Sequence, residues 1–78
     1  MDGLIEKSVN DWLLLQFEMT EKQIEMNRIL LTNKLKNVTK KYDIIKYCIN
    51  KNQIILFDEK LKPITFNLNV HPTIHYQK

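Results

Sequence analysis

The feature that most constrains this chain is a stretch from Trp12 to Phe57 that contains neither glycine nor proline. In and just before its first half, apolar residues recur at intervals of three, four or seven, the spacing of one face of an α-helix. This stripe consists of Val9, Leu13, Phe17, Ile24, Leu31, Leu35 and Val38. A second line beside it consists of Trp12, Leu15, Met19, Met26 and Leu30. Together the two lines are wider than the apolar face of an ordinary surface helix.

An apolar surface of this width needs more cover than one small sheet supplies. The chain has 78 residues, which allows one domain near the lower size limit for a self-sufficient core. Cys48 is the only cysteine, so no internal disulfide can compensate. Oligomerisation is then the remaining source of stability. We therefore expect the helix to pack against helices that belong largely to another molecule.

The helix has several sequence signals for its ends. Residues 8–11 resemble an N-cap with an acidic third residue, which predicts a short helix over residues 3–7 that bends into the longer one. Residues 20–23 form a capping-box sequence, so a break near Met19, giving a helical hairpin, is the alternative to one long helix. The continuous apolar spacing favours the long helix. The weak helix formers in residues 33–40 predict its end there.

After Tyr42 the apolar spacing changes from helical to alternating. In residues 45–50, Ile45, Tyr47 and Ile49 alternate with polar residues and Cys48, which predicts a strand with one apolar face. The three residues 50–52 then supply a turn, and residues 54–57 a second strand.

The residues after the second predicted strand predict at least one more strand. Residues 64–70 alternate most regularly, and Pro63 suits a strand start. Residues 71–76 are either a frayed tail or a short edge strand. We therefore predict an α+β fold, in which a long helix or helical hairpin over residues 1–40 forms half of a bundle. Residues 41–78 then form a three- to four-stranded antiparallel meander that contributes to an intermolecular barrel.

Charge is distributed unevenly along the chain. Residues 1–31 contain three basic and six acidic residues, whereas residues 32–78 contain nine lysines and three acidic residues. A cluster of lysines where the helix ends and the sheet begins is a candidate for contacts with DNA phosphates, although lysine near a helix C-terminus is also favoured by the helix dipole. This cluster comprises Lys34, Lys36, Lys40, Lys41, Lys46 and Lys51.

The residues that catalysis or metal binding would need do not form a pattern. With Gly3 as the only glycine, a glycine-rich phosphate loop is excluded. His71 and His75 have the spacing of helical zinc ligands, but Pro72 lies between them, and we expect a solvated tail. Cys48 is expected to be a buried packing residue. We predict no enzymatic activity, no cofactor and no metal. Because the sequence lacks a signal peptide and any apolar run long enough to span a bilayer, we expect an intracellular protein without membrane contact.

The order of these segments resembles the small (gamma) subunit of general transcription factor IIA over about residues 1–70. The matching blocks are residues 1–5 (MDGLI), 14–18 (LLQFE), 46–50 (KYCIN) and 54–57 (IILF). One departure is residues 51–54 (KNQI), which stand where the family has an aromatic strand near the TATA-binding protein. The resemblance implies two helices in a four-helix bundle and three or more strands in a barrel completed by a large subunit. That barrel would then abut the TATA-binding protein and place lysines along DNA phosphates.

We therefore expect a non-enzymatic subunit of transcription initiation, half of an obligate heterodimer that stabilises the TATA-binding protein on promoter DNA. Its partners would be the large subunit, the TATA-binding protein or a viral equivalent, and promoter DNA through its phosphates. It would act in the nucleus, or in the cytoplasm if a virus transcribes there. The predicted partner-helix interface is Trp12, Leu13, Phe17, Ile24, Leu31 and Leu35. The predicted sheet edge facing a partner is Lys46, Tyr47, Cys48, Ile49 and Asn50. The alternative is a small homodimeric viral or phage inhibitor or adaptor that acts by protein–protein binding.

Overall fold

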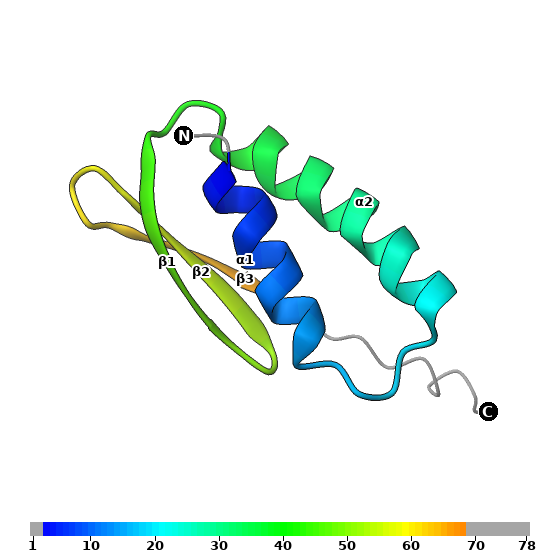
Figure 1. The fold of residues 1–78 in the computed structure, drawn as a ribbon. Coiled ribbons are helices and arrows are strands. Elements are labelled where there is room, and N and C mark those ends of the chain that lie inside the picture. The colour runs from blue at the N-terminus through cyan, green and yellow to red at the C-terminus, as the bar shows by residue number, and fades with distance from the viewer. Residues whose placement is uncertain (1–2, 69–78) are drawn as a thin grey trace.

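The structure is a computed structural model and describes residues 3–68 (Figure 1). Two helices come first, and a three-stranded antiparallel sheet in the order β1-β2-β3 follows, so the prediction of an α+β fold is confirmed. The elements are α1 (Gly3–Leu14), α2 (Glu21–Thr39), β1 (Ile44–Asn50), β2 (Gln53–Asp58) and β3 (Pro63–Asn67).

Helix α1 lies in the middle of the molecule, between the sheet and α2 (Figure 1). It packs on one face of the sheet, chiefly against β1, while α2 packs against the other side of α1. The core fills the space between these layers. Its buried apolar residues are Ile5, Val9, Trp12, Leu13, Leu31, Leu35, Ile44, Ile54, Leu56 and Leu68.

The prediction of one continuous long helix is wrong. The structure has the alternative, a helical hairpin. The chain leaves the helical conformation after Leu14 and begins α2 at Glu21. A complete capping box starts the second helix: the Thr20 hydroxyl accepts from the Gln23 amide at 3.1 Å, and the Gln23 side chain accepts from the Thr20 amide at 3.0 Å. These bonds satisfy backbone donors that a helix start leaves without partners, so the local signal prevailed over the apolar spacing.

The bend predicted near Ser8 does not occur either. Helix α1 runs unbroken from Gly3 to Leu14, and Ser8 lies buried in its middle. Its hydroxyl donates to the carbonyl of Ile5 at 2.7 Å, one turn earlier. A serine that finds a backbone acceptor in its own helix does not need to act as a cap.

The hairpin of β1 and β2 and the third strand lie where the sequence predicts them, with one local shift. The register slips between Ile44 and Lys46, so Ile44 is buried and Ile45 is exposed. The prediction that Ile45 shares a face with Tyr47 is therefore wrong, because the alternation has a bulge at this point. β3 ends at Asn67, so Leu68 is not part of the strand as predicted. Residues 69–70 of the predicted strand, like the fourth strand over residues 71–76, lie outside the described residues.

The connection between β2 and β3 is organised by Asp58, which is buried. Its carboxylate Oδ1 accepts from the backbone amides of Lys60 and Lys62, at 2.8 and 2.9 Å. Within this turn Leu61 has a φ of 62°, a left-handed conformation that strains a residue with a branched side chain. The two hydrogen bonds to the Asp58 carboxylate therefore stabilise the turn although Leu61 has a strained backbone.

Candidate protein-binding surface

The outward side of α2 carries a row of residues spaced four apart. Lys22, Met26, Leu30 and Lys34 follow one another at this interval, and Ile29 lies beside Met26 and Leu30. Met26 is 56% exposed, Ile29 54% and Leu30 63%. We call these five residues the α2 ridge. Three adjacent apolar side chains left in water on one helix form the kind of patch that protein partners cover.

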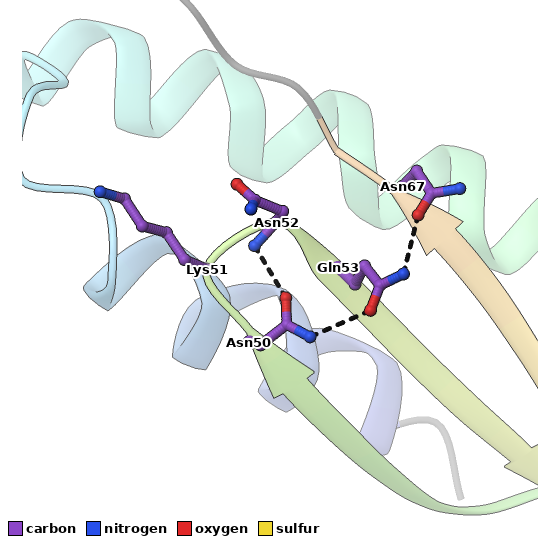
Figure 2. Close-up of a pocket in the computed structure, with 5 residues that line it drawn as sticks. All are labelled: Asn50, Lys51, Asn52, Gln53 and Asn67. Carbon is purple, nitrogen blue, oxygen red and sulfur yellow. Dashed lines mark hydrogen bonds between the residues drawn. The ribbon is translucent and has the colours of Figure 1, made fainter.

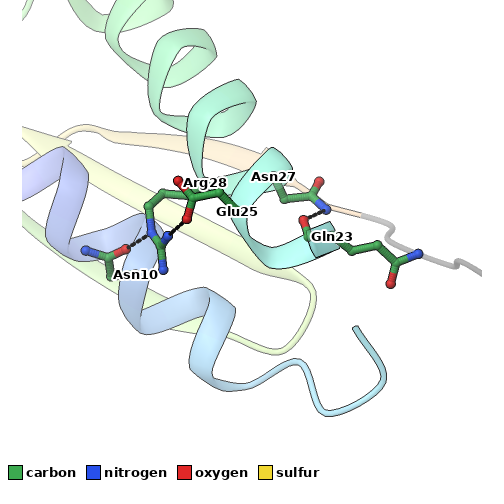
Figure 3. Close-up of polar contacts among 5 residues, drawn as sticks. All are labelled: Asn10, Gln23, Glu25, Asn27 and Arg28. Atoms are coloured by element: carbon green, nitrogen blue, oxygen red, sulfur yellow. Dashed lines mark hydrogen bonds and ion pairs between the residues drawn. The ribbon is translucent and has the colours of Figure 1, made fainter. Parts of the chain in front are cut away.

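One polar contact shows which side of α2 faces α1 (Figure 3). The guanidinium of Arg28 donates to the side chain of Asn10 on α1 at 2.9 Å and pairs with Glu25. Asn27 donates to the carbonyl of Gln23 at 2.8 Å. Since Arg28 reaches towards α1, it holds that side of α2 against the rest of the chain, and the ridge faces away.

The sequence prediction of the partner-helix interface mixed two kinds of residue. Four of its members, Trp12, Leu13, Leu31 and Leu35, are buried in the chain's own core. They are covered by α1, α2 and the sheet of the same molecule. The chain thus covers much of the surface that was expected to need another molecule.

The other two members have different positions. Ile24 is half-buried at the edge of the core. Phe17 is 86% exposed and lies in the loop between the helices, next to the exposed Leu14 at the end of α1. Phe17 is therefore not part of a helical stripe, because the helix has already ended. Met26 and Leu30 were predicted only to widen the apolar stripe, and Ile29 was not among the predicted interface residues.

The sheet offers a second surface, on its edges. Within residues 3–68, β1 and β3 each pair with β2 alone, so each has one open edge. In β1, Tyr47 and Ile49 face α1, whereas Lys46, Cys48 and Asn50 are exposed on the opposite face. The prediction that Cys48 is buried is wrong, because the strand turns that face to solvent.

The face of the sheet opposite α1 is organised in rows across the three strands. One end carries Lys46, Phe57 and Pro63, with the Lys46 ammonium 5.0 Å from the centre of the Phe57 ring. The middle row is Cys48, Ile55 and Thr65. This face is therefore partly apolar at the end where β1 begins.

The other end of this face is a row of side-chain amides (Figure 2). Asn50 donates to the Gln53 side chain at 3.0 Å, and Gln53 donates to the Asn67 side chain at 2.9 Å. The Asn50 oxygen also accepts from the backbone amide of Asn52 at 2.9 Å. With Lys51, these residues line a shallow open depression. The row links all three strands at the end of the sheet.

Two ionisable pairs join elements that are distant in the sequence. A hydrogen bond and ion pair from Lys36, at 2.6 Å, lower the pKa of the half-exposed Glu6 carboxyl below its usual range. The Tyr47 hydroxyl donates to the Asp11 carboxylate at 2.5 Å, and this hydrogen bond, followed by burial and the negative charge of Asp11, raises the pKa of Tyr47. The first pair ties α2 to α1, and the second ties β1 to α1.

The predicted phosphate-contacting lysines are all exposed, but they do not form one patch. Lys40 and Lys41 lie where α2 ends, and Lys36 and Lys40 line a depression between α2 and the start of β1. Lys46 is on the outer sheet face near that end of β1. Lys51 lies beyond the other end of β1, in the turn to β2. Lys34 belongs to the α2 ridge.

The part of the chain that the structure describes contains no group of three His, Cys, Asp or Glu side chains able to hold a metal ion. His71 and His75 lie outside it. None of the described helices is both long and apolar enough to cross a membrane. Comparisons of the chain with protein-family models, with curated proteins and with solved structures gave no match.

Proposed function

We propose that this protein is a non-enzymatic subunit of a two-chain complex of the transcription factor IIA kind, which stabilises the TATA-binding protein on promoter DNA. The order of a helical hairpin followed by an antiparallel meander is the layout that the resemblance implies for the small subunit. In this proposal the hairpin is half of a helix bundle and the sheet is part of a barrel shared with a large subunit.

The observation that carries the proposal is the α2 ridge. The hairpin has already buried one face of α2 against α1, yet Met26, Ile29 and Leu30 remain exposed on the opposite face. A helix that is apolar on two faces is typical of a bundle with more helices than one chain supplies. Exposed Leu14 and Phe17 at the tip of the hairpin add apolar surface for the same purpose.

The sheet supports the proposal through its edges. A three-stranded sheet with two open edges presents backbone N–H and C=O groups to which another strand can bind. The bulge at Ile44 and Lys46 and the proline at the start of β3 protect these edges only at one end. Strand addition from the large subunit would complete the barrel.

Lysines near the α2–β1 connection supply the proposed contacts with DNA. Lys40, Lys41 and Lys46 are exposed around this connection. Lysines bind phosphates with little base preference, which suits a subunit that supports a sequence-specific protein on DNA.

Reconstitution tests the proposal. The chain would be expressed alone and together with the large subunit of the same organism, and its mass in solution measured. We then expect the pair to retard a complex of TATA-binding protein and promoter DNA further in a gel, with no effect of either subunit alone. A stable homodimer that leaves this complex unchanged would contradict the proposal and favour a homodimeric inhibitor or adaptor.

Backbone hydrogen exchange adds a second readout that does not depend on DNA. We expect the amides of residues 45–49 or 64–67 to gain protection only when the large subunit is present. Equal protection of these amides in the isolated, monomeric chain would show that the sheet needs no added strand.

A further inference from the structure

The row of α2 ridge residues that are spaced four apart begins and ends with a lysine. Lys22 precedes Met26 by one helical turn, and Lys34 follows Leu30 by one turn, so an apolar centre lies between two exposed lysines. The acidic residues of α2 are Glu21 and Glu25; neither is on the row of Lys22, Met26, Leu30 and Lys34, but Glu25 lies one turn before Ile29. Glu25 is already paired with Arg28. The row from Lys22 to Lys34 is thus apolar in the middle with a lysine at each end, and one turn beyond Lys34 it continues to Val38, which is 50% exposed.

We propose that the occupant of this ridge is an amphipathic helix whose apolar stripe is flanked by acidic residues. This inference rests on the proposed function and names the chemistry of the partner's helix. Rows of residues four apart on one helix pack into the grooves of another, so Met26 and Leu30 would form the apolar contact. Carboxylates on the partner would then lie near Lys22 and Lys34, as flanking charges do in helix pairs that select their partner.

The same charges argue against a second copy of this chain as the occupant. In a symmetric antiparallel pair of α2 helices, Lys22 of one copy lies opposite Lys34 of the other, because the two residues are equally far from the centre of the row. In a parallel pair each lysine lies opposite the same lysine of the other copy. Both arrangements place like charges together at the two ends of the contact, which disfavours self-association.

Two synthetic peptides about 20 residues long can serve as probes, since helices of that length can form on a binding surface. Both have the same leucine stripe, and one is flanked by glutamates and the other by lysines. Binding of each labelled peptide to the full chain is measured by fluorescence anisotropy. We expect the acidic peptide to bind about tenfold more tightly than the basic one, as two exposed ion pairs against two repulsions allow.

Charge reversal on the ridge provides the decisive comparison. The variant Lys22→Glu/Lys34→Glu should prefer the basic peptide. The matched variant Lys60→Glu/Lys62→Glu changes the net charge equally but lies in the β2–β3 turn, and it should keep the preference for the acidic peptide. If both variants change the preference equally, attraction by net charge alone accounts for the binding and the inference is overturned.

Loss of the apolar contact is tested separately. Leu30→Ser should abolish binding without lowering the melting temperature, whereas Leu61→Ser, at a similarly exposed leucine in the β2–β3 turn, should leave binding intact. Unchanged binding by Leu30→Ser would overturn the inference. So would a homodimer whose interface protects the ridge, or tighter peptide binding after removal of residues 69–78, which would identify the chain's own C-terminal segment as the occupant.

The reconstituted complex separates the two proposals. If the two subunits form the slower band with the TATA-binding protein and DNA but Lys22→Glu/Lys34→Glu does not weaken their pairing, the function stands and this inference fails. If the ridge selects the acidic peptide but no such band forms, the inference stands and the function fails.

Discussion

The indole nitrogen of Trp12 donates a hydrogen bond to the backbone carbonyl of Lys51, with 3.0 Å between Nε1 and the oxygen. This bond joins the last turns of α1 to the turn between β1 and β2. The side-chain amide of Gln16 donates to the same carbonyl at 3.1 Å. The completely buried indole and its bond therefore fix where the end of α1 lies on the sheet.

Replacing Trp12 should cost far more stability than replacing Gln16. We expect Trp12→Ala to lower the free energy of unfolding by about 3–5 kcal/mol through the cavity it creates. Trp12→Phe should cost about 1–2 kcal/mol, since the carbonyl of Lys51 keeps Gln16 as a donor. Urea unfolding measures both changes, with Gln16→Ala as the control that should lie below about 0.5 kcal/mol. Equal losses from Trp12→Phe and Gln16→Ala would show that the indole bond has no special role.

Removal of the capping hydroxyl should destabilise α2. Thr20→Ala leaves the Gln23 amide without its acceptor and should cost about 1 kcal/mol. Thr20→Ser retains the hydroxyl and should restore most of the loss. Thermal unfolding followed by circular dichroism compares the two variants. A Thr20→Ala protein as stable as the parent would indicate that the hairpin is set by packing alone.

Relief of backbone strain at Leu61 should stabilise the protein. Glycine adopts the φ of 62° without a Cβ clash, and the Leu61 side chain is 58% exposed, so little packing is lost. We expect Leu61→Gly to raise the free energy of unfolding by about 0.5–1 kcal/mol, the difference between strain relieved and added freedom in the unfolded chain. Lys60→Gly in the same turn should not stabilise, and a gain there as large as at Leu61 would exclude strain as the cause.

The bond between Tyr47 and Asp11 should make stability fall at alkaline pH. Because the pKa of Tyr47 is raised above 10.0 in the folded protein, the neutral phenol is favoured by folding. This contribution is fully present below the unfolded pKa of 10.0 and is lost as pH rises through the higher folded pKa. Tyr47→Phe should remove this part of the decline, and Asp11→Asn should reduce it. Unfolding curves measured on both sides of that pKa test this, and identical pH profiles for Tyr47→Phe and the parent would contradict it.

The lysines should differ in their contribution to DNA binding by the assembled complex. Each phosphate neutralised adds about 0.9 to the slope of log affinity against log salt. Reversing Lys40, Lys41 and Lys46 should lower this slope, because these side chains surround the α2–β1 connection. Lys51→Glu, beyond the far end of β1, should change it less. A slope that responds only to Lys51 would place the DNA at the opposite end of the sheet.

The elements of the sheet could be predicted because their apolar residues alternate over short runs. The hairpin turn at residues 50–52 and the start of β3 at Pro63 follow directly from local residue types. The shift at Ile44 and Lys46 could not be predicted, since both Ile44 and Ile45 are apolar and the sequence does not say which one faces the core. This ambiguity explains why Ile45 was predicted on the wrong face of the sheet.

The helices were harder because one apolar spacing continued across a break. Leu13 and Leu31 fall on a single stripe only if residues 15–20 are helical, and they are not. The capping box at Thr20 was the local signal that resets the helical phase. Counting from Thr20 separates the buried Leu31 and Leu35 from the exposed Met26 and Leu30. The exposed residues of α2 could therefore be predicted from the sequence, but only if a new helix is taken to begin after Thr20.

The rows on the sheet face opposite α1 give that face a direction. Hydrocarbon from Phe57 and Pro63 lies at one end, and the linked amides of Asn50, Gln53 and Asn67 lie at the other. A segment that crosses this face lengthwise would meet carbon first and hydrogen-bonding groups last, or the reverse. A bound segment that is apolar at one end and polar at the other would match this face in only one of the two orientations. The face would therefore select the direction in which such a segment binds.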